Sequence, residues 1–438
     1  MSVFGFINIS KPVITPEDRA WVEDNFKWLI KTFGYPAPEQ EQKTISPQYF
    51  PKTFSSNTIT IDHVVADLCA LLNVPENKIA VEIHTDIRDS QNAPYESGGA
   101  PNTRVEVTKN GYRIHVFNYL LSRPERLVIE LLYEFIAIRL TESRVNWGTG
   151  KEAELFIYLA AVYFNFGLIL AQHLADIGRK TDGLWEHKWS NLSQMPPQVM
   201  AFALALQSKL TAQHNPVWIT ELSGSIKSDL KNAMSLLESN PSPLVNKDEI
   251  EVALMFEKSN EQYYSNDFRA AIDTLESVIK LTEDKKLKSV ALNNIGYYLQ
   301  RLKEYEKSIP YFEQAIAFDH EFGYAHDNLG YSLIKCGQLE EGKKSIAKAL
   351  SIPNNEPSFS YRNMALYYWA KGDRAEAEKN FQIAFETETE ELPVDLLELH
   401  YAEFLLDQGE TEKAMQFLRA AVEKGEPEAI AKMKELTR

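Results

Sequence analysis

The sequence predicts a mostly α-helical protein in which an N-terminal α+β domain precedes a solenoid of helical repeats. Three patterns indicate this architecture: a 34-residue period in the C-terminal part, a strand and a hairpin within residues 78–118, and two long apolar segments typical of buried helices. The chain has 438 residues, of which 44% are hydrophobic and 11% are aromatic, so it can bury two or three cores.

The first helices are marked by their boundary residues. The segment TPEDRAWVEDNFKWLIKTFG is amphipathic, with Thr15 placed as the N-cap, Pro16 in the first turn and Gly34 at the end. The segment TIDHVVADLCALLNV (60–74) predicts a second helix.

A small sheet is expected next. The segment KIAVEIHTD (78–86) alternates like a strand, and TRVEVTKNGYRIHVFN (103–118) reads as a hairpin with Asn110-Gly111 in a type I′ turn. The glycine-rich segment 96–102 is expected to be a loop between strands. Ser122 to Glu125 has the pattern of a capping box, which predicts that a helix starts there.

Two buried helices follow the sheet. The stretch RLVIELLYEFIAIRL (126–140) places Glu134 in an apolar helix, where a charge is costly unless it is paired or protonated. The stretch 155–171 is apolar except for Asn165, but it is short for a bilayer and has no flanking Lys/Arg cluster, so we expect a core helix and no membrane span. A further helix is expected near residues 216–237. The domains are therefore predicted as 1–237, a linker at 238–247, and 248–438.

The C-terminal period has the residue pattern of a known repeat. Gly296 and Gly330 are 34 residues apart, as are Ala315 and Ala349. The repeated positions are small residues at the eighth place (Gly296, Gly330, Ala365, Ala402), small residues at the twentieth (Ser308, Gly342, Ala377, Ala414) and larger ones four later (Phe312, Ile346, Phe381, Leu418). These units resemble tetratricopeptide repeats, with about five units in residues 248–428 and a charged tail that caps the stack.

The resemblance to tetratricopeptide repeats implies that the first helix of each unit lines a concave face. The inward positions of three units are Val290, Asn293, Tyr297 and Gln300, then Tyr324, Asp327, Tyr331 and Ile334, then Phe359, Arg362, Leu366 and Trp369. Aromatic residues and arginine are typical of binding hot spots. The candidate partner-binding residues are Asn293, Tyr297, Gln300, Tyr324, Asp327, Tyr331, Arg362, Leu366 and Trp369. Alternatively, some of them only pack between units; Lys303 and Glu341 are expected on the convex side.

The N-terminal region resembles a bacterial zincin-like family. The resemblance lies in the order of the segments DRAWVEDNFKWLIKTFG, YFPKTF, the hairpin and its following helix, VYFNFGLIL and LSQMPPQVMAFALALQSKL. In zincins, H-E-x-x-H on a helix binds zinc, and the glutamate activates water. Here the window reads Tyr133-Glu134-Phe135-Ile136-Ala137, so both histidines are replaced. The resemblance therefore implies a degenerate domain, a pseudo-peptidase in which Glu134 is structural.

Other chemistry has little support in the sequence. The two cysteines, Cys69 and Cys336, allow no disulfide framework and no cysteine-based metal site. None of the nine histidines pairs at a spacing of three or four, so no metal and no cofactor are expected; a convergence of His84, His115 and His173 in space stays open. The tryptophans of the segment 183–198 either form a substrate-binding loop or pack over a domain end.

The function predicted from these patterns is the binding of another protein or peptide, without catalysis. The formal net charge of −16 disfavours nucleic acid and suits a basic partner. The N-terminus shows no signal-peptide pattern, so a cytoplasmic location is expected. Two alternatives stay open: a metal-independent or cryptic hydrolase in the N-terminal domain, and an acidic immunity or chaperone-like protein that neutralises one basic partner.

Overall fold

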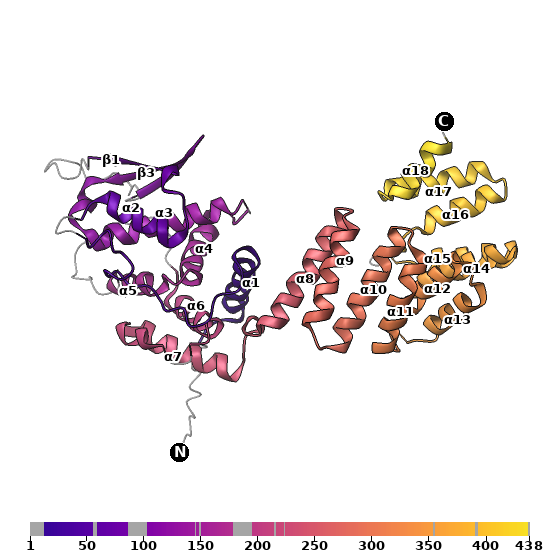
Figure 1. Cartoon of the computed structure of the whole chain (residues 1–438), viewed down its shortest axis with the longest axis horizontal. Coiled ribbons are helices and arrows are strands. Elements are labelled where there is room, and N and C mark those ends of the chain that lie inside the picture. Colours follow the sequence, from indigo (N-terminus) through magenta and orange to yellow (C-terminus); the bar gives the residue numbers. More distant parts are fainter. Residues whose placement is uncertain are drawn as a thin grey trace, which may run out of the picture. The chain divides into compact units, whose positions relative to one another are not determined.

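The computed structural model of the chain divides into two compact units, Met1–Lys247 and Asp248–Arg438 (Figure 1). Each unit is described by itself. The structure describes residues 13–55, 59–85, 103–144, 146–148, 150–177, 195–213, 216–222, 224–353, 355–389 and 393–436. The predicted loop 96–102 and the tryptophans Trp185 and Trp189 lie outside the described residues.

The N-terminal unit is mostly helical with one small sheet. Its helices are α1 (Pro16–Phe33), α2 (Ile61–Leu72), α3 (Pro124–Glu142), α4 (Gly150–Tyr163), α5 (Gly167–Ile177), α6 (Pro197–Leu210) and α7 (Gly224–Ser239). Its strands are β1 (Ile79–His84), β2 (Thr103–Thr108) and β3 (Gly111–Phe117), and its short 3-10 helices are η1 (Glu76–Lys78), η3 (Asn118–Ser122), η4 (Val217–Glu221) and η5 (Pro243–Val245). The predicted boundaries of α1 are confirmed: the Thr15 side chain accepts from the backbone N–H of Asp18, and Gly34 follows the last turn.

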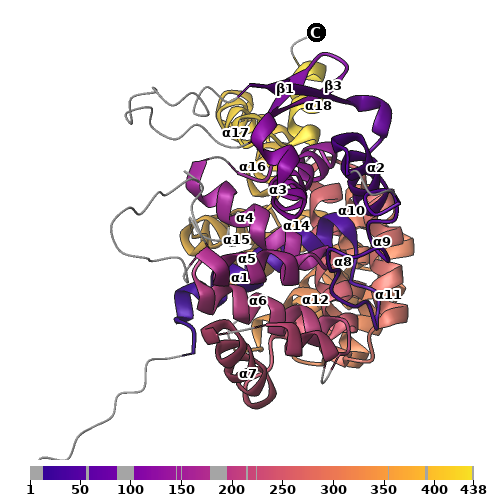
Figure 2. The same cartoon turned by 90° about the vertical axis from the view of Figure 1, so that its left-hand side faces the viewer.

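The three strands form a sheet in the order β1-β3-β2. The β1 strand runs parallel to β3, and β2 runs antiparallel to it, so the predicted strand and hairpin are confirmed. Tyr112, Ile114 and Val116 of β3 are buried, whereas the alternate side chains Arg113 and His115 are more exposed. Figures 1 and 2 both show the sheet lying over α2 and α3, so its buried face is the one that packs on these helices.

The hairpin turn differs from the predicted type I′ turn. Thr108 pairs with Gly111, so the two turn residues are Lys109 and Asn110, and neither has a positive φ. Gly111 is instead the first residue of β3 and lies against η1: a Cβ atom there would be 2.2 Å from the carbonyl oxygen of Lys78. This close approach of two backbones, rather than turn geometry, explains the glycine.

The predicted capping box at the start of α3 is also wrong. The Ser122 hydroxyl donates to the carbonyl oxygen of Tyr119, and α3 starts at Pro124 after Arg123, which makes no side-chain capping bond. The preceding residues Asn118–Ser122 already form η3, so Ser122 belongs to that turn. The conformation of Ser122 is therefore determined by the connection between β3 and α3 and not by the local capping pattern.

The apolar stretch 155–171 forms two helices instead of the single one expected. The break lies at Asn165, whose φ of 65° is left-handed and which is buried. Its side-chain oxygen accepts from the Gln207 amide at 2.9 Å, and its amide donates to Gln40 at 2.9 Å. Among the described residues, none of the helices combines the length and the apolarity that crossing a bilayer requires.

The segment predicted as a linker packs on the N-terminal unit. The helix α7 runs to Ser239, and η5 follows after a short turn. Leu244 is buried, and the Tyr35 hydroxyl donates to its carbonyl oxygen at 2.9 Å. Residues 238–247 are therefore held by side chains far away in the sequence of the same unit.

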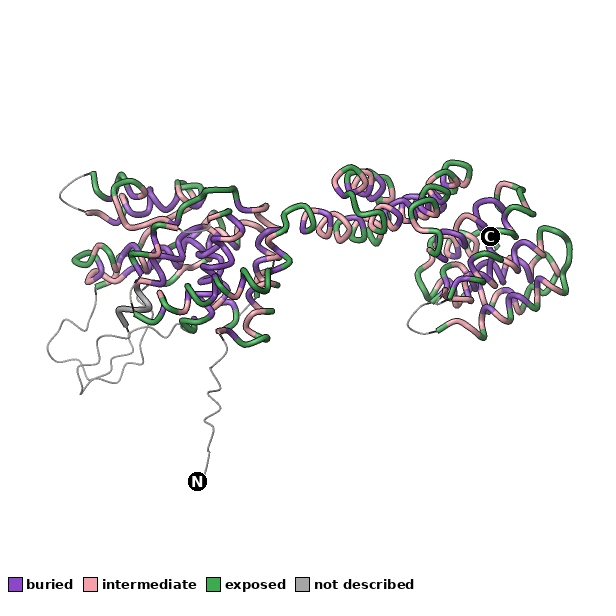
Figure 3. The backbone as a smooth tube through the Cα atoms, turned by 90° about the horizontal axis from the view of Figure 1, so that it is seen from below, coloured by how far each residue is buried: buried purple, intermediate pink, exposed green. Residues whose placement is uncertain are grey.

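The C-terminal unit is a run of antiparallel helix pairs. The helices are α8 (Lys247–Tyr264), α9 (Phe268–Leu281), α10 (Lys285–Arg301), α11 (Tyr305–Phe318), α12 (Gly323–Lys335), α13 (Leu339–Leu350), α14 (Pro357–Lys371), α15 (Arg374–Thr387), α16 (Leu397–Asp407), α17 (Thr411–Glu423) and α18 (Pro427–Leu436). Buried residues line the facing sides of these helices, and the exposed residues lie at the turns and outer faces (Figure 3).

Small residues let the paired helices approach closely. A Cβ atom on Gly296 of α10 would lie 2.6 Å from the ring of Phe312 in α11, and one on Gly330 of α12 would lie 2.5 Å from Ile346 in α13. Phe312 and Ile346 are fully buried, so neither can move aside freely.

Replacement of either glycine by alanine should therefore destabilise the protein. We expect Gly296→Ala and Gly330→Ala each to lower the free energy of unfolding by about 1–3 kcal/mol, because an added methyl overpacks the helix contact. Differential scanning calorimetry of the full chain measures this. The control Glu313→Ala, at an exposed position of α11, should stay within about 0.5 kcal/mol; glycine variants as stable as this control would contradict the close-contact explanation.

Candidate functional site

The described part of the C-terminal unit contains a pocket of about 190 Å³, here called the repeat pocket. Its lining side chains come from α10, α11, α12, α14, α16 and α18 and from the turns beside them. They are Tyr297, Gln300, Arg301, Lys303, Tyr305, Asn328, Tyr331, Lys335, Phe359, Arg362, Asp395, Leu396, Leu399, His400, Glu403 and Glu428. Residues more than a hundred positions apart in the sequence therefore share one site.

Tyr331 is the centre of the repeat pocket. The guanidinium of Arg362 lies 5.1 Å from the centroid of its ring, and the ammonium of Lys335 lies 5.4 Å from it. The Tyr331 hydroxyl is 3.4 Å from Nε2 of His400, and burial raises the pKa of Tyr331 far above neutral pH. An uncharged tyrosine thus has two cations near its ring, and the negative face of an aromatic ring attracts cations.

The turn before α16 closes one side of the repeat pocket. The Tyr297 hydroxyl donates to the carboxylate of Asp395, which is 98 residues further along the chain. The guanidinium of Arg362 donates to the backbone carbonyl of Asp395 at 2.7 Å, and Arg301 pairs with Glu428 at 3.0 Å. These contacts fix the position of α16 relative to α10 and α14.

Some residues that line the repeat pocket have buried polar atoms without a hydrogen-bond partner in the described part of the chain. Within the described residues, Nε of Arg362 and Nδ1 of His400 are buried and make no hydrogen bond. Burial lowers the pKa of His400 well below its usual value, and the nearby cations Lys335 and Arg362 lower it further. His400 is therefore neutral, and the arginine offers an unused N–H donor.

Four of the nine predicted partner-binding residues line the repeat pocket: Tyr297, Gln300, Tyr331 and Arg362. Gln300 also joins two repeats, because its amide donates to the carbonyl of Asn328 at 2.7 Å and to the hydroxyl of Ser332 at 2.8 Å. Gln300 therefore both lines the pocket and packs between two repeat units.

The other five predicted residues lie outside the lining of this pocket. Asn293 is buried and accepts from Asn328, and Leu366 is part of the buried core. Tyr324 packs edge-on against Phe359.

Asp327 and Trp369, the last of these five, bind neighbouring helices. Buried Asp327 accepts from the Ser360 hydroxyl at 2.7 Å, and its burial raises the pKa of the carboxyl to about 7. The Trp369 indole packs against Phe404 and donates to Asp407 at 3.3 Å. Both contacts join consecutive repeat units.

Sequence reasoning identified the fourth unit but not its inward positions, and it misplaced Lys303. Counting these positions from Ala402, as was done for the first three units, gives Leu396, Leu399, Glu403 and Leu406, and the first three of these line the repeat pocket. Lys303, expected on the convex side, lies in the turn after α10 with a φ of 61° and also lines the pocket. The repeat pattern could therefore have predicted the pocket residues of the fourth unit, but it gives no information about this turn.

Glu134 faces the sheet. Its carboxylate accepts from the Thr103 hydroxyl at 3.0 Å and from the backbone N–H of Val105, both in β2. Burial raises the pKa of Glu134 to about 7, with Glu130 adding to the effect, while the two hydrogen bonds oppose it. Both ways of accommodating this carboxyl that the sequence suggested are present: it has hydrogen-bond partners, in the edge strand β2, and its raised pKa favours protonation.

The two positions that replace the zincin histidines have different surroundings. The Tyr133 ring lies 5.7 Å from that of Tyr158, and its hydroxyl points to the carbonyl of Glu154 at 3.4 Å. Ala137 offers no ligand atom and its carbonyl accepts from Thr141 within α3. Tyr133 therefore packs against α4.

Two of the three histidines that were considered together do meet. Nε2 of His84 lies 2.9 Å from Nδ1 of His115 on the more exposed face of the sheet. The side chain of His173 lies outside the described part of the chain.

Family comparisons match the C-terminal unit. One tetratricopeptide repeat family matches residues 362–429, and a second matches residues 290–320 and 324–356. The C-terminal unit contains tetratricopeptide repeats. No curated protein matches the chain significantly.

Solved structures with similar folds are tetratricopeptide repeat proteins of low identity. One from Parabacteroides merdae has 14% identity and a TM-score of 0.37, and the match covers 66% of this chain and 99% of that chain. YrrB, described as a TPR protein with an unusual peptide-binding site, has 15% identity and a TM-score of 0.30, with 46% and 98% covered. MamA from Desulfovibrio magneticus RS-1 has 17% identity and a TM-score of 0.28, with 36% and 91% covered.

The environment of Glu134 makes stability depend on pH. A carboxyl whose pKa rises from 4.5 to about 7 on folding stabilises the native state at low pH, and this contribution, at most about 3 kcal/mol, is lost as pH rises through 7. We expect Glu134→Gln to abolish this loss, so that the variant gains stability relative to wild type between pH 4.5 and 8. Melting temperatures across this range test it.

The control is Glu125→Gln, an exposed position on the same helix, which should follow the wild-type profile. A Glu134→Gln variant that is less stable than wild type at pH 8 as well as at pH 5 would show that the carboxylate itself holds α3 against β2.

Proposed function

We propose that the protein binds another protein or a peptide through the repeat pocket, and that the pocket accepts an acidic or carbonyl group of the partner. The observation that carries this proposal is the unused donor of buried Arg362 beside Tyr331. A buried N–H without an acceptor costs about 1–3 kcal/mol, so a partner that supplies an oxygen gains this energy on binding.

The cations of the pocket differ in how they are used. Arg301 is paired with Glu428, although its Nε makes no hydrogen bond within the described residues, and Arg362 reaches only a backbone carbonyl with one of its nitrogens. The ammonium of Lys335 lies near the ring of Tyr331, and burial lowers its pKa while Glu403 opposes that effect. We propose Arg362 and Lys335, which both lie beside the ring of Tyr331, as the pair that holds a carboxylate.

The size of the pocket limits what enters it. A volume of about 190 Å³ is below the range of about 300–1,000 Å³ typical for whole small-molecule ligands. A single side chain or a chain terminus fits this space, and the remainder of a peptide would lie along the neighbouring first helices. Tyr324 and Trp369, which are partly exposed there, are proposed as flanking contacts.

For the N-terminal unit we propose a non-catalytic role, in keeping with the resemblance to a degenerate zincin-like domain. Glu134 is engaged by Thr103 and Val105, and neither Tyr133 nor Ala137 offers an imidazole. Two alternative hypotheses remain, a cryptic hydrolase and a neutraliser of one basic partner. The cytoplasmic location remains an expectation. Peptidase assays on the purified full chain separate the first alternative from binding.

The proposal is tested by selection of binders from a random peptide library displayed with free C-termini. We expect the selected peptides to carry Asp, Glu or a terminal carboxylate at one fixed place. The variants Arg362→Gln and Lys335→Met should weaken their binding about tenfold or more, because each removes a charge-assisted hydrogen bond. Tyr297→Ala and Trp369→Ala should cost about 2 kcal/mol, roughly thirtyfold, if they act as anchors.

The matched control is Lys344→Gln, an exposed position of α13 outside the pocket lining, which should bind like wild type. Circular dichroism confirms that each variant is folded. If the pocket variants bind like wild type while deletion of residues 1–240 abolishes binding, the N-terminal unit is the binding module and the proposal fails.

A further inference from the structure

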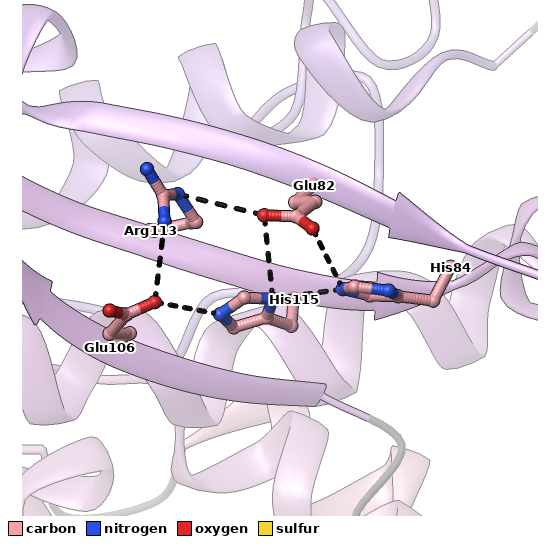
Figure 4. Close-up of polar contacts among 5 residues, drawn as sticks. All are labelled: Glu82, His84, Glu106, Arg113 and His115. Atoms are coloured by element: carbon pink, nitrogen blue, oxygen red, sulfur yellow. Dashed lines mark hydrogen bonds and ion pairs between the residues drawn. The ribbon is translucent and has the colours of Figure 1, made fainter.

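Two glutamates, two histidines and an arginine lie together on the more exposed face of the N-terminal sheet (Figure 4). Glu82 and His84 come from β1, Glu106 from β2, and Arg113 and His115 from β3. The register places Glu82 directly opposite His115, and the period of two along a strand puts His84 on the same face as Glu82. The grouping is thus a product of strand pairing, and no single motif in the sequence contains it.

We propose that Glu82, His84 and His115 form a binding site for a divalent zinc ion. His84 Nε2 and His115 Nδ1 are 2.9 Å apart, Glu82 Oε1 is 3.7 Å from His84 Nε2, and Glu82 Oε2 is 3.9 Å from His115 Nδ1. Ligands of a tetrahedral zinc ion with bonds of about 2.1 Å are about 3.4 Å apart. The two distances from Glu82 are to different oxygens of its carboxylate, and with one ligand atom per residue the three atoms lie within 4.8 Å of one another. Side-chain rotations that move these atoms by about 1 Å therefore bring them to the spacing that the ion requires.

Glu106 gives the site a second layer. Its carboxylate accepts from Nε2 of His115 at 3.2 Å, which keeps the proton on that nitrogen and leaves the lone pair of Nδ1 directed toward His84. A carboxylate behind a histidine is the usual arrangement at protein zinc sites, where it fixes the tautomer and makes the imidazole more basic. This contact is a second observation, independent of the distances among the ligands.

The contact between the two imidazoles marks the position of the ion. With the proton of neutral His115 on Nε2, beside Glu106, its Nδ1 can only accept, and this assigns the hydrogen between the rings to Nε2 of His84. A zinc ion replaces that hydrogen, and the proton of His84 moves to Nδ1 of the same ring. No net proton release is needed, and both nitrogens then present lone pairs to one point.

Arg113 holds the two carboxylates without occupying the site. Its guanidinium lies 3.6 Å from Glu82 and 3.5 Å from Glu106. It limits the motion of both acids and leaves the imidazole nitrogens free. The side chain of His84 is 39% exposed and that of His115 is 18% exposed, so zinc can enter from solvent and a water molecule can complete the fourth position.

Two imidazoles and one carboxylate form a ligand set that favours zinc over magnesium and calcium. Imidazole favours zinc and its neighbours among the transition metals, whereas magnesium and calcium require oxygen ligands. A large excess of Mg²⁺ should therefore not displace zinc. Bound zinc joins β1 to β3, and the melting temperature of the N-terminal unit should rise with zinc concentration.

The test uses the untagged full chain, stripped of metal, with Zn²⁺ titrated in competition with a chromophoric zinc chelator. We expect one equivalent to bind. His84→Ala and His115→Ala should each weaken binding at least about 100-fold, and Glu82→Gln should weaken it similarly. Glu106→Gln, which keeps the ligands and alters only the outer carboxylate, should weaken it by about 10–100-fold.

Two controls locate the binding. His320→Ala removes an exposed histidine in the C-terminal unit, and Glu134→Gln alters the window on α3; both should bind zinc like wild type. The proposal is overturned if wild type shows no saturable zinc binding, or if the double variant His84→Ala/His115→Ala keeps the wild-type stoichiometry and affinity. It is equally overturned if Glu134→Gln, and not the strand variants, abolishes binding.

Discussion

The repeat unit depends on one kind of contact, a small residue on the first helix of a pair against a large side chain on the second. Gly296 meets Phe312 and Gly330 meets Ile346, and Ala365 and Phe381 belong to the same buried cluster. Because these contacts let the two helices of a pair approach closely, successive pairs can stack, and the first helices come to line one side. The repeat pocket is a consequence of this stacking, since its walls come from six different helices.

The sequence predicted the features that are decided by residues close together along the chain. Residue periods indicated the repeats, and Thr15 and Gly34 marked α1, because capping is decided within a few residues. The type I′ turn and the capping box failed where tertiary contacts decide: Gly111 lies against the backbone of Lys78, and Ser122 is held in η3. The role of Asp395 in the pocket is also a long-range effect, since its partner Tyr297 lies 98 residues earlier.

The buried carboxylate of α3 has its explanation in the strand pattern. In an antiparallel pair, alternate residues of a strand direct their N–H groups away from the partner strand. Thr108 closes the hairpin with Gly111, so Val105 is one of the residues of β2 whose N–H points outward, and Glu134 accepts from it. Glu134, in an apolar part of α3, thus accepts a hydrogen bond from an N–H at the edge of the sheet. The sequence showed that this carboxylate needs a partner but could not identify the strand that supplies it.

The charge of the whole chain limits which partner the repeat pocket can hold. With a formal net charge of −16, the protein repels polyacidic segments, although four cations and three acids line the pocket itself. An isolated acid or a chain terminus within an otherwise neutral or basic segment avoids this repulsion and still reaches Arg362 and Lys335. Selectivity for such a segment follows from two distance ranges. The cations of the pocket attract an acid within a few ångströms, and the net negative charge repels further acids up to about the Debye length, which is about 8 Å at physiological salt and longer at low ionic strength.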